Sequence, residues 1–303
     1  MMNKTNLQKK FISLLPDVKV RLWEPVAKHT SFRIGGPAEI MVFPETAEEL
    51  SAVLKQSEVL DCKVTILGAG TNVLAPDEGM QGVVVCLKDA LSSMQLLDGN
   101  RIRIAAGVTM ARAAVFACNH SLSGFEFAHG IPGTVGGGVY MNAGAYGGEI
   151  AHVCESVEVM DLSGTVKTLT AAEMQFSYRH SRLEAEGGIV VSAVFALQPG
   201  IESEIREKMQ ELMQKRKSSQ PLDLPSAGSA FKRPVGGYAA ALIDEAGLKG
   251  FRVGDAAVSE KHAGFVVNLG SATAAEVKEL LGTVAECVYK RSGIRLEPEV
   301  RIW

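Results

Sequence analysis

Two glycine-rich segments carry the residues best suited to bind an anionic ligand. LGAGTN (67–72) follows a predicted strand, and in GIPGTVGGGVYMNAGAYGGE (130–149) eight of twenty residues are glycine. Consecutive backbone N–H groups in glycine turns form a concave nest for an anion such as a pyrophosphate. The two segments can therefore hold opposite sides of one long ligand without a basic side chain. Ile131, Val135 and Val139 are predicted to anchor the second segment to the core.

Two common nucleotide-binding motifs are excluded. A dinucleotide fingerprint requires a third glycine after Gly68 and Gly70, and Val73 occupies that position. The sequence also contains no Gly-Lys pair, so the P-loop motif is missing. The structural alternatives are a plain β-turn at GAG and tight packing of both glycine loops against a sheet. A third glycine pair, in HTSFRIGGPAE (29–39), brings Arg33, which either faces an anionic ligand or lies on the surface.

Alternating strands and helices are expected to position these segments, which is typical of α/β lobes. The helix TAEELSAVLKQ is predicted to begin with a capping box of Thr46 and Glu49. A hairpin is predicted to turn at Ser163-Gly164. The predicted strands are 38–44, 63–70, 82–87, 101–109, 156–170 (the hairpin), 188–197, 262–268 and 294–303, and the other predicted helices are 110–120, 201–217, 238–247 and 272–290.

The pattern predicts two α/β lobes and a smaller third unit. Residues 1–19 read as a helical lead, and the lobes as about 20–88 and 89–218. The segment SSQPLDLPSAGS (218–229), rich in proline and serine, is expected to connect domains. The third unit is expected at 219–303, with its last strand, about 293–303, returning to the active site.

Composition narrows the class of function. The 303 residues are 47% hydrophobic and 21% charged, with a net charge of −3, so nucleic acid and anionic membranes are not expected partners. No apolar run approaches a membrane span, and the N-terminus lacks the features of a signal peptide. The five cysteines form no CxxC pair and the six histidines have no metal-ligand spacing, so no metal site is expected. These features predict a cytoplasmic protein.

Seven motifs, in order along the chain, resemble those of UDP-N-acetylenolpyruvoylglucosamine reductases, also called UDP-N-acetylmuramate dehydrogenases. They are FRIGGPA (32–38), ILGAGTNVL (66–74), the glycine-rich segment 130–149, YRHSRL (178–183), GSAFKRP (228–234), SEKHAGFVVN (259–268) and LEPEVR (296–301). The resemblance covers nearly the whole chain from about residue 20. Ala69 and Gly138 stand where glycine and alanine are frequent in relatives, and both residues remain small.

The resemblance implies an α+β fold made of α/β lobes. It has an FAD-binding domain of the vanillyl-alcohol oxidase (PCMH) type in two lobes, about 20–218, plus a smaller α+β substrate domain. FAD is held without a covalent bond, and NADPH reduces it. The flavin then reduces the enolpyruvyl ether of a UDP-sugar to the lactyl ether of UDP-N-acetylmuramate in peptidoglycan synthesis. The chain resembles the shorter class of the family, which lacks an insertion whose tyrosine folds over substrate.

The resemblance also assigns roles to individual residues. Ser229 matches the proton donor, Arg179 the active-site arginine and Glu299 the catalytic glutamate. The UDP-sugar is expected to meet Tyr178, Lys232, Arg233 and His262. The expected FAD contacts are Gly68, Ala69, Gly70, Thr71, Asn72, Ile131, Pro132, Gly133, Thr134, Gly136, Gly137, Asn142, Gly144 and Gly148.

Each role has a structural alternative. Ser229 can be a turn serine and Arg179 a partner in a surface ion pair. Glu297 shares a face with Glu299 if their strand is regular, which Pro298 can prevent. The cluster Lys215–Lys217 is read as solvated, and His129 as packing rather than as a covalent flavin attachment.

Two rival functions remain at this stage. One is an oxidase of the same flavin fold that acts on an alcohol or lactone and uses oxygen, and the other is a non-catalytic flavin-binding protein. The motifs of Ser229, Arg179 and Glu299 favour the reductase, because together they suit alkene reduction. The enzyme is expected to act on small molecules as a monomer.

Overall fold

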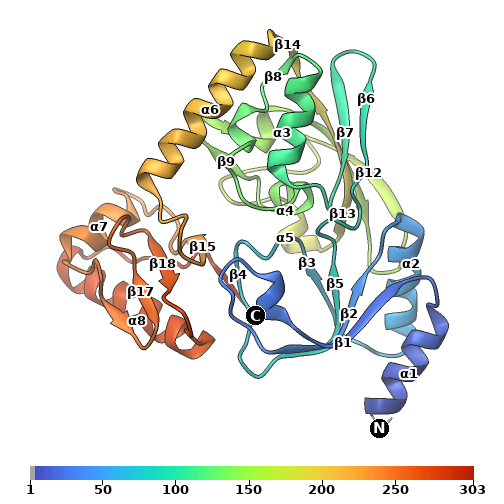
Figure 1. Ribbon diagram of the computed structural model, residues 1–303, viewed down its shortest axis with the longest axis horizontal. Helices are drawn as coiled ribbons and strands as arrows, with labels where there is room; N and C mark the ends of the chain where they lie inside the picture. The colour runs from blue at the N-terminus through green and yellow to red at the C-terminus, as the bar shows by residue number, and fades with distance from the viewer. Residues whose placement is uncertain (1–3) are drawn as a thin grey trace. The chain divides into compact units, whose positions relative to one another are not determined.

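The computed structural model describes residues 4–303, which form two compact units (Figure 1). Unit 1 comprises the described part of Met1–Leu22, with Ile40–Ala69 and Gln81–Gln214, and unit 2 comprises Trp23–Glu39, Gly70–Met80 and Lys215–Trp303. Each unit has its own cluster of buried apolar side chains. The units are discontinuous along the chain, whereas the predicted domains are continuous ranges, and the predicted lobe 20–88 contributes to both units.

The first sheet has the strand order β1-β2-β5-β3. Strands β3 and β5 run parallel, with Leu67 opposite Cys86. The helix α2 connects β2 to β3 and buries Leu50, Val53 and Leu54 at helical spacing. These elements are β1 (Lys19–Pro25), β2 (Pro37–Phe43), α2 (Ala47–Val59), β3 (Val64–Leu67) and β5 (Met80–Cys86). The strands predicted at 38–44, 63–70 and 82–87 are therefore confirmed, with small shifts at their ends.

The second sheet lies in unit 1 and is antiparallel, in the order β12-β11-β13-β7-β6. Seven of the eight residues of its central strand β13 are buried, as its apolar sequence predicts. The hairpin predicted at Ser163-Gly164 is formed by β11 and β12, and Gly164 has a φ of 82°. The strands are β6 (Met94–Leu97), β7 (Arg101–Ala105), β11 (Cys154–Met160), β12 (Val166–Thr170) and β13 (Ile189–Ala196).

Several further elements complete unit 1. The predicted helical lead 1–19 contains α1, and its residues 1–3 lie outside the described residues. The helices predicted at 110–120 and 201–217 correspond to α3 and α6, and the end of α6 belongs to unit 2. The elements are α1 (Lys4–Leu14), α3 (Met110–Asn119), β8 (Leu122–Ser123), α4 (Val135–Tyr140), β9 (Gly144–Ala145), β10 (Gly148–Glu149), α5 (Leu183–Glu186), β14 (Gln198–Pro199), α6 (Glu202–Ser219) and the 3₁₀ turns Glu126–Ala128 and Ile150–His152. A further 3₁₀ turn, Val26–His29, belongs to unit 2.

The capping box predicted for α2 is only half present. The Thr46 side chain accepts a hydrogen bond from the Glu49 backbone N–H, at 3.1 Å. The Glu49 carboxylate accepts from the Glu45 N–H, at 2.7 Å, rather than from that of Thr46. The carboxylate therefore satisfies a donor one residue before the expected one, and the start of the helix is still as predicted.

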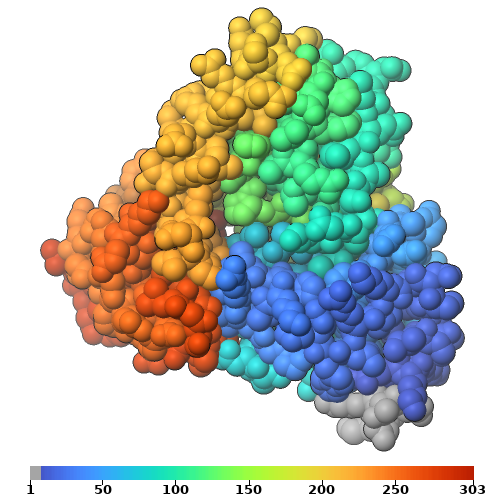
Figure 2. All heavy atoms as spheres, in the orientation of Figure 1, coloured from blue at the N-terminus to red at the C-terminus, as the bar shows by residue number. Residues whose placement is uncertain are grey.

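Unit 2 is a four-stranded antiparallel sheet in the order β15-β18-β17-β16, with two helices. Figure 2 shows the orange-to-red part of the chain, which forms most of this unit, gathered into one body. The helices predicted at 238–247 and 272–290 and the strand at 262–268 are confirmed. The elements are β4 (Val73–Leu74), β15 (Ser226–Ser229), α7 (Ala239–Glu245), β16 (Arg252–Val253), β17 (Ala256–Val258), β18 (Phe265–Asn268), α8 (Ala274–Ser292) and β19 (Arg301–Ile302).

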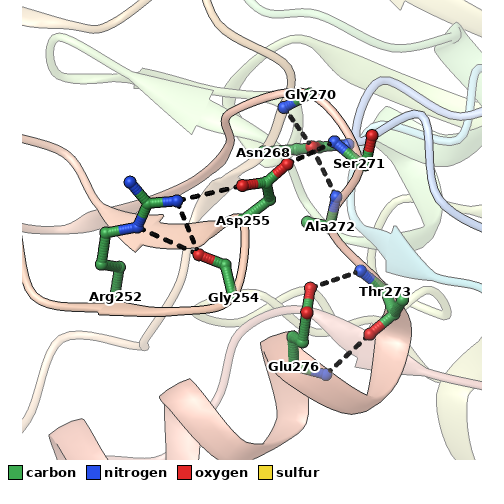
Figure 3. A network of polar contacts seen from close by, with 9 residues as sticks. All are labelled: Arg252, Gly254, Asp255, Asn268, Gly270, Ser271, Ala272, Thr273 and Glu276. Atoms are coloured by element: carbon green, nitrogen blue, oxygen red, sulfur yellow. Dashed lines mark hydrogen bonds and ion pairs between the residues drawn. The ribbon is translucent and has the colours of Figure 1, made fainter.

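The N-terminus of α8 is held by a network of polar contacts (Figure 3). Thr273 and Glu276 form a complete capping box. Asp255 accepts a hydrogen bond from the Ser271 N–H and pairs with Arg252, both at 3.0 Å. In addition, the two carboxylate oxygens of Asp77 accept from Ala274 N and Ala275 N, at 2.7 and 3.1 Å. The loop that follows β4 is thereby tied to the first turn of α8.

The closing strand predicted at 294–303 is much shorter in the structure. Only β19 is a strand, and it pairs in parallel with β4, while Pro298 makes a single bridge to Phe231. Proline lacks a backbone N–H and so cannot donate to a ladder of hydrogen bonds. A continuous strand over 294–303 is therefore absent, and the pairing is limited to the single bridge at Pro298 and to β19.

None of the helices in the described part of the chain is both long enough and apolar enough to cross a membrane.

Replacing Asp77 by alanine is expected to lower the free energy of unfolding by about 1 kcal/mol, because two N–H groups at the start of α8 lose their carboxylate partner. Thermal or urea denaturation measures the loss. Asp98→Ala, an exposed position in a turn of unit 1, is the control and should leave stability unchanged. Equal midpoints for Asp77→Ala and the control would contradict this role of Asp77.

Candidate active site

In unit 1 the two glycine-rich segments lie against each other. A Cβ atom added to Gly68, just after β3, would lie 2.6 Å from the Thr134 hydroxyl oxygen, just before α4. A larger residue at this position would have to displace the Thr134 hydroxyl, so glycine lets the segments approach this closely. Within residues 4–303 the backbone N–H groups of Gly68, Ala69, Gly133 and Thr134 have no hydrogen-bond acceptor. The contact brings four available donors into one region of unit 1.

The centre of the second glycine segment is a short helix rather than an open loop. Helix α4 begins after Thr134, whose hydroxyl accepts a hydrogen bond from the Gly137 N–H at 3.4 Å. The N–H groups of Val135 and Gly136 donate to backbone carbonyls, at 2.8 and 2.9 Å. These amides are therefore committed within the protein, and the predicted nest cannot include them.

Three glycines of this segment are required by packing. A Cβ on Gly136 would lie 2.8 Å from that of Ala106, and one on Gly148 would lie 2.6 Å from the Phe127 ring. A Cβ on Gly144 would meet Glu149 across the β9–β10 hairpin. The structure thus supports the packing alternative at these three positions. By contrast, Gly137 is exposed, with only the Thr134 hydroxyl near its missing side chain.

Apolar residues anchor the segment as predicted. Val135 and Val139 are fully buried in the core of unit 1. Ile131 is partly buried against the same core, while Pro132 is exposed.

Tyr178 and Arg179 are the two central residues of a tight turn in unit 1. Ser177 and His180 exchange two backbone hydrogen bonds across the turn, each of 3.1 Å. Arg179 has a φ of +55°, a left-handed conformation that costs a residue other than glycine about 1 kcal/mol. Its guanidinium lies 5.2 Å from the centre of the Tyr178 ring, which is 54% exposed. The strain at Arg179 and the exposed ring of Tyr178 are both compatible with the predicted binding role of this turn.

This turn is tied to the end of the glycine-rich segment. Buried Asn142 donates from its amide to the Ser177 carbonyl, at 3.0 Å. The Ser181 hydroxyl, also buried, donates to the Tyr140 carbonyl, at 2.8 Å. Sequence reasoning missed these two supporting bonds, because nothing in the spacing of the motifs reveals partners 35 and 41 positions apart.

In unit 2, Ser229 and Glu299 lie on neighbouring segments. Ser229 ends β15 opposite Phe265 of β18. The carbonyl of the next residue, Ala230, accepts a hydrogen bond from the Glu299 N–H, at 2.9 Å. The structure thus brings together two of the three predicted catalytic residues through backbone pairing, although 70 positions of sequence separate them.

Asn72 ties the first glycine motif to the Glu299 segment. Its side-chain amide donates to the Glu299 carbonyl, at 3.1 Å, and its own carbonyl accepts from the Arg301 N–H, at 3.0 Å. Gly70 packs against Thr30, where a Cβ would lie 2.7 Å from the Thr30 Cα. The predicted cofactor residues Gly70 and Asn72 therefore also have structural roles in unit 2.

The predicted substrate residues of unit 2 have partners within the protein. Lys232 pairs with the Glu297 carboxylate, and the Arg233 guanidinium lies 4.1 Å from the centre of the Tyr238 ring. Burial lowers the pKa of His262, whose Nδ1 accepts a hydrogen bond from the Gly264 N–H at 3.1 Å. The imidazole is therefore neutral at pH 7 and cannot act as a cation toward a phosphate.

His129 precedes the second glycine segment in unit 1. Its Nδ1 is buried without a hydrogen-bond partner in the described chain, and burial lowers its pKa. Residues 4–303 contain no cluster of three or more histidine, cysteine, aspartate or glutamate side chains that could hold a metal ion.

The comparisons with known proteins agree in both halves of the chain. Residues 220–303 match the C-terminal domain family of UDP-N-acetylenolpyruvoylglucosamine reductase, and residues 38–170 match an FAD-binding domain family. UDP-N-acetylenolpyruvoylglucosamine reductases of Streptococcus pneumoniae strains 70585 and Hungary19A-6 are each 44% identical over 297 residues, which cover 98% of this chain and 98% of each relative.

Solved structures give the same result. The crystal structure of UDP-N-acetylenolpyruvylglucosamine reductase from Thermus caldophilus has 37% sequence identity and a TM-score of 0.79, covering 94% of this chain and 98% of that one. An alkyldihydroxyacetonephosphate synthase, 15% identical, superposes with a TM-score of 0.50 over 65% of this chain and 41% of its own. This second likeness concerns the fold alone, and the fold is the predicted α+β one, with an FAD-binding domain of the vanillyl-alcohol oxidase type.

Gly136 and Gly137 offer a matched pair of substitutions within α4. Gly136→Ala is expected to lower the free energy of unfolding by roughly 2 kcal/mol, because the new methyl group collides with Ala106 in a filled core. Gly137→Ala is expected to leave it unchanged or to raise it by under about 1 kcal/mol, because alanine favours the helix and its methyl group makes only an ordinary contact, 3.6 Å from the Thr134 hydroxyl oxygen. Urea denaturation of flavin-free protein measures both, and equal losses would refute the packing role of Gly136.

Proposed function

The chain belongs to the UDP-N-acetylenolpyruvoylglucosamine reductase family, and we propose that Ser229, Arg179 and Glu299 carry out its reaction. It is an FAD-binding oxidoreductase of peptidoglycan biosynthesis that uses NADPH as reductant. The proposed reaction reduces the enolpyruvyl ether of the UDP-sugar to the lactyl ether of UDP-N-acetylmuramate. The observation that carries the proposal is the backbone pairing of the Ser229 and Glu299 segments, at 2.9 Å between Glu299 N and Ala230 O.

The glycine segments of unit 1 fit the pyrophosphate of FAD. The available N–H groups of Gly68, Ala69, Gly133 and Thr134 form a donor set that suits an anion without a basic side chain. We therefore assign FAD contacts to these residues, and give Gly136, Gly144 and Gly148 the role of shaping the wall. These residues would hold FAD, which when bound and reduced would supply the hydride for the reaction.

The protein must hold the alkene, stabilise negative charge and deliver one proton. Hydride addition at one alkene carbon leaves negative charge on its neighbour, beside the substrate carboxylate. We assign the binding of that carboxylate to Arg179, because a guanidinium pairs with a carboxylate through two hydrogen bonds. Its position in a constrained turn limits the freedom of the side chain, which favours a fixed geometry.

The proton is assigned to the hydroxyl of Ser229. A hydroxyl is a weak acid, and the strongly basic carbanion-like carbon is an acceptor able to take its proton. Glu299, on the segment paired to Ala230, is assigned the task of orienting that hydroxyl and of relaying a proton from solvent back to the serine after the transfer.

The UDP group is assigned to Tyr178, Lys232, Arg233 and His262. To bind a phosphate, Lys232 must leave the carboxylate of Glu297. The Glu297 side chain is 70% exposed, so breaking this solvated ion pair costs little free energy. His262 contributes as a neutral ring. We further propose that the enzyme acts in the cytoplasm, as a monomer, on small molecules alone.

Ser229→Ala is expected to keep normal FAD content and normal reduction by NADPH, and to slow reoxidation by the UDP-sugar roughly 100-fold or more, because the proton donor is lost. Anaerobic stopped-flow absorbance of the flavin band separates the two half-reactions. Ser226→Ala, the same change at the other end of β15, is the control and should behave as wild type. An unchanged second half-reaction in Ser229→Ala would remove Ser229 from the mechanism.

The same apparatus tests the rival oxidase. Reduced wild-type enzyme is expected to be reoxidised by the UDP-sugar much faster than by dissolved oxygen. Prompt reoxidation by oxygen together with no response to the sugar would favour the oxidase.

A further inference from the structure

Asn142 connects two turns of unit 1 through its buried side chain. Its Nδ2 donates to the carbonyl of Ser177, at 3.0 Å, and its Oδ1 accepts from the N–H of Ala151, at 2.9 Å. Only 1% of the residue is exposed. The first bond reaches the turn of Tyr178 and Arg179, and the second reaches the 3₁₀ turn that follows the β9–β10 hairpin. Exchanging the amide oxygen and nitrogen would break both bonds, so the orientation of the side chain is determined.

The turn that Asn142 binds has a strained backbone. Arg179, its second central residue, has a φ of +55°, which requires support from the surroundings. That support comes from both flanks: Asn142 binds Ser177 before the central residues, and Ser181 binds Tyr140 after them, at 2.8 Å. Both anchors join the turn to the end of the glycine-rich segment.

We infer that Asn142 is a positioning residue for Arg179 rather than a contact of FAD. The inference rests on the proposed function of Arg179. Both polar groups of the Asn142 side chain already have a partner within unit 1, and only 1% of the residue is exposed, so little of it is open to a cofactor. Losing the Ser177 bond removes one of the two anchors of the turn and thereby loosens the direction of the guanidinium.

Asn142→Asp is the sharpest variant. Asn142 has a φ of +44°, and aspartate shares the tolerance of asparagine for left-handed backbone. The carboxylate can still accept from Ala151 but cannot donate to Ser177. In its ionised form the substitution therefore breaks the bond to the Arg179 turn, keeps the bond to Ala151, and places a buried charge against the Ser177 carbonyl.

The expected result is a split between half-reactions. FAD content and the rate of reduction by NADPH should match wild type, while reoxidation by the enolpyruvyl UDP-sugar should slow roughly 10- to 100-fold, as for a displaced catalytic group. Ser181→Ala, which removes the other anchor, should also keep reduction by NADPH normal and slow reoxidation by the UDP-sugar. It replaces Asn142→Asp as the test if that variant does not fold. Ser57→Ala, which removes a buried side-chain bond to Val53 in α2, is the control and should leave both half-reactions unchanged.

A double-mutant cycle separates positioning from other roles. In an Arg179→Ala background, Asn142→Asp should slow the second half-reaction no further, since the group that it positions is gone. Loss of FAD in Asn142→Asp, an equal effect of Ser57→Ala, or losses that multiply in the double variant would overturn the inference and leave the role of Arg179 intact. A wild-type second half-reaction in Arg179→Ala alone would instead refute the proposed role of Arg179, and the inference with it.

Discussion

The pairing of the last strand with β4 is the constraint on which the candidate site of unit 2 depends. Because β19 lies parallel to β4, the carbonyl of Asn72 receives the Arg301 N–H and the Asn72 amide reaches the Glu299 carbonyl. In the same segment the Glu299 N–H donates to the carbonyl of Ala230, the residue after Ser229. A serine, a glutamate and the end of a glycine motif are thus placed by backbone bonds, which hold position more firmly than contacts between long side chains.

The glycines of unit 1 serve two purposes that the sequence does not distinguish. At Gly136 and Gly148 the missing side chain lets elements pack, while at Gly68 it lets a loop approach Thr134 beside available backbone donors. A high density of glycine is therefore compatible with a rigid wall. The buried Val135 and Val139 make the wall rigid. Its ability to bind a ligand comes from the few backbone N–H groups that have no acceptor within the protein.

Most strands and long helices could be predicted from their apolar residues, which form a continuous run in β13 and recur at helical spacing in α8. The helix α4 could not, since its glycines have low helix propensity and only the close approach of Gly136 to Ala106 explains it. The prediction of a closing strand over 294–303 was wrong around Pro298, where the structure has only an isolated bridge. The motifs predicted catalytic roles for Ser229 and Glu299, and these roles stay predictions. The motifs did not predict the hydrogen bonds of the Asn142 and Ser181 side chains, because tertiary contacts between distant residues leave no local pattern.

The discontinuity of unit 2 has a consequence for how the chain folds during synthesis. Its core joins Phe32, Ile34 and Leu74 to side chains beyond residue 226. Those three apolar residues leave the ribosome long before the partners that bury them, and β4 must wait for β19. Closing such long loops is slow, so the early segments stay exposed while the rest of the chain is made. Assembly of the Ser229 region is therefore one of the last events expected in folding.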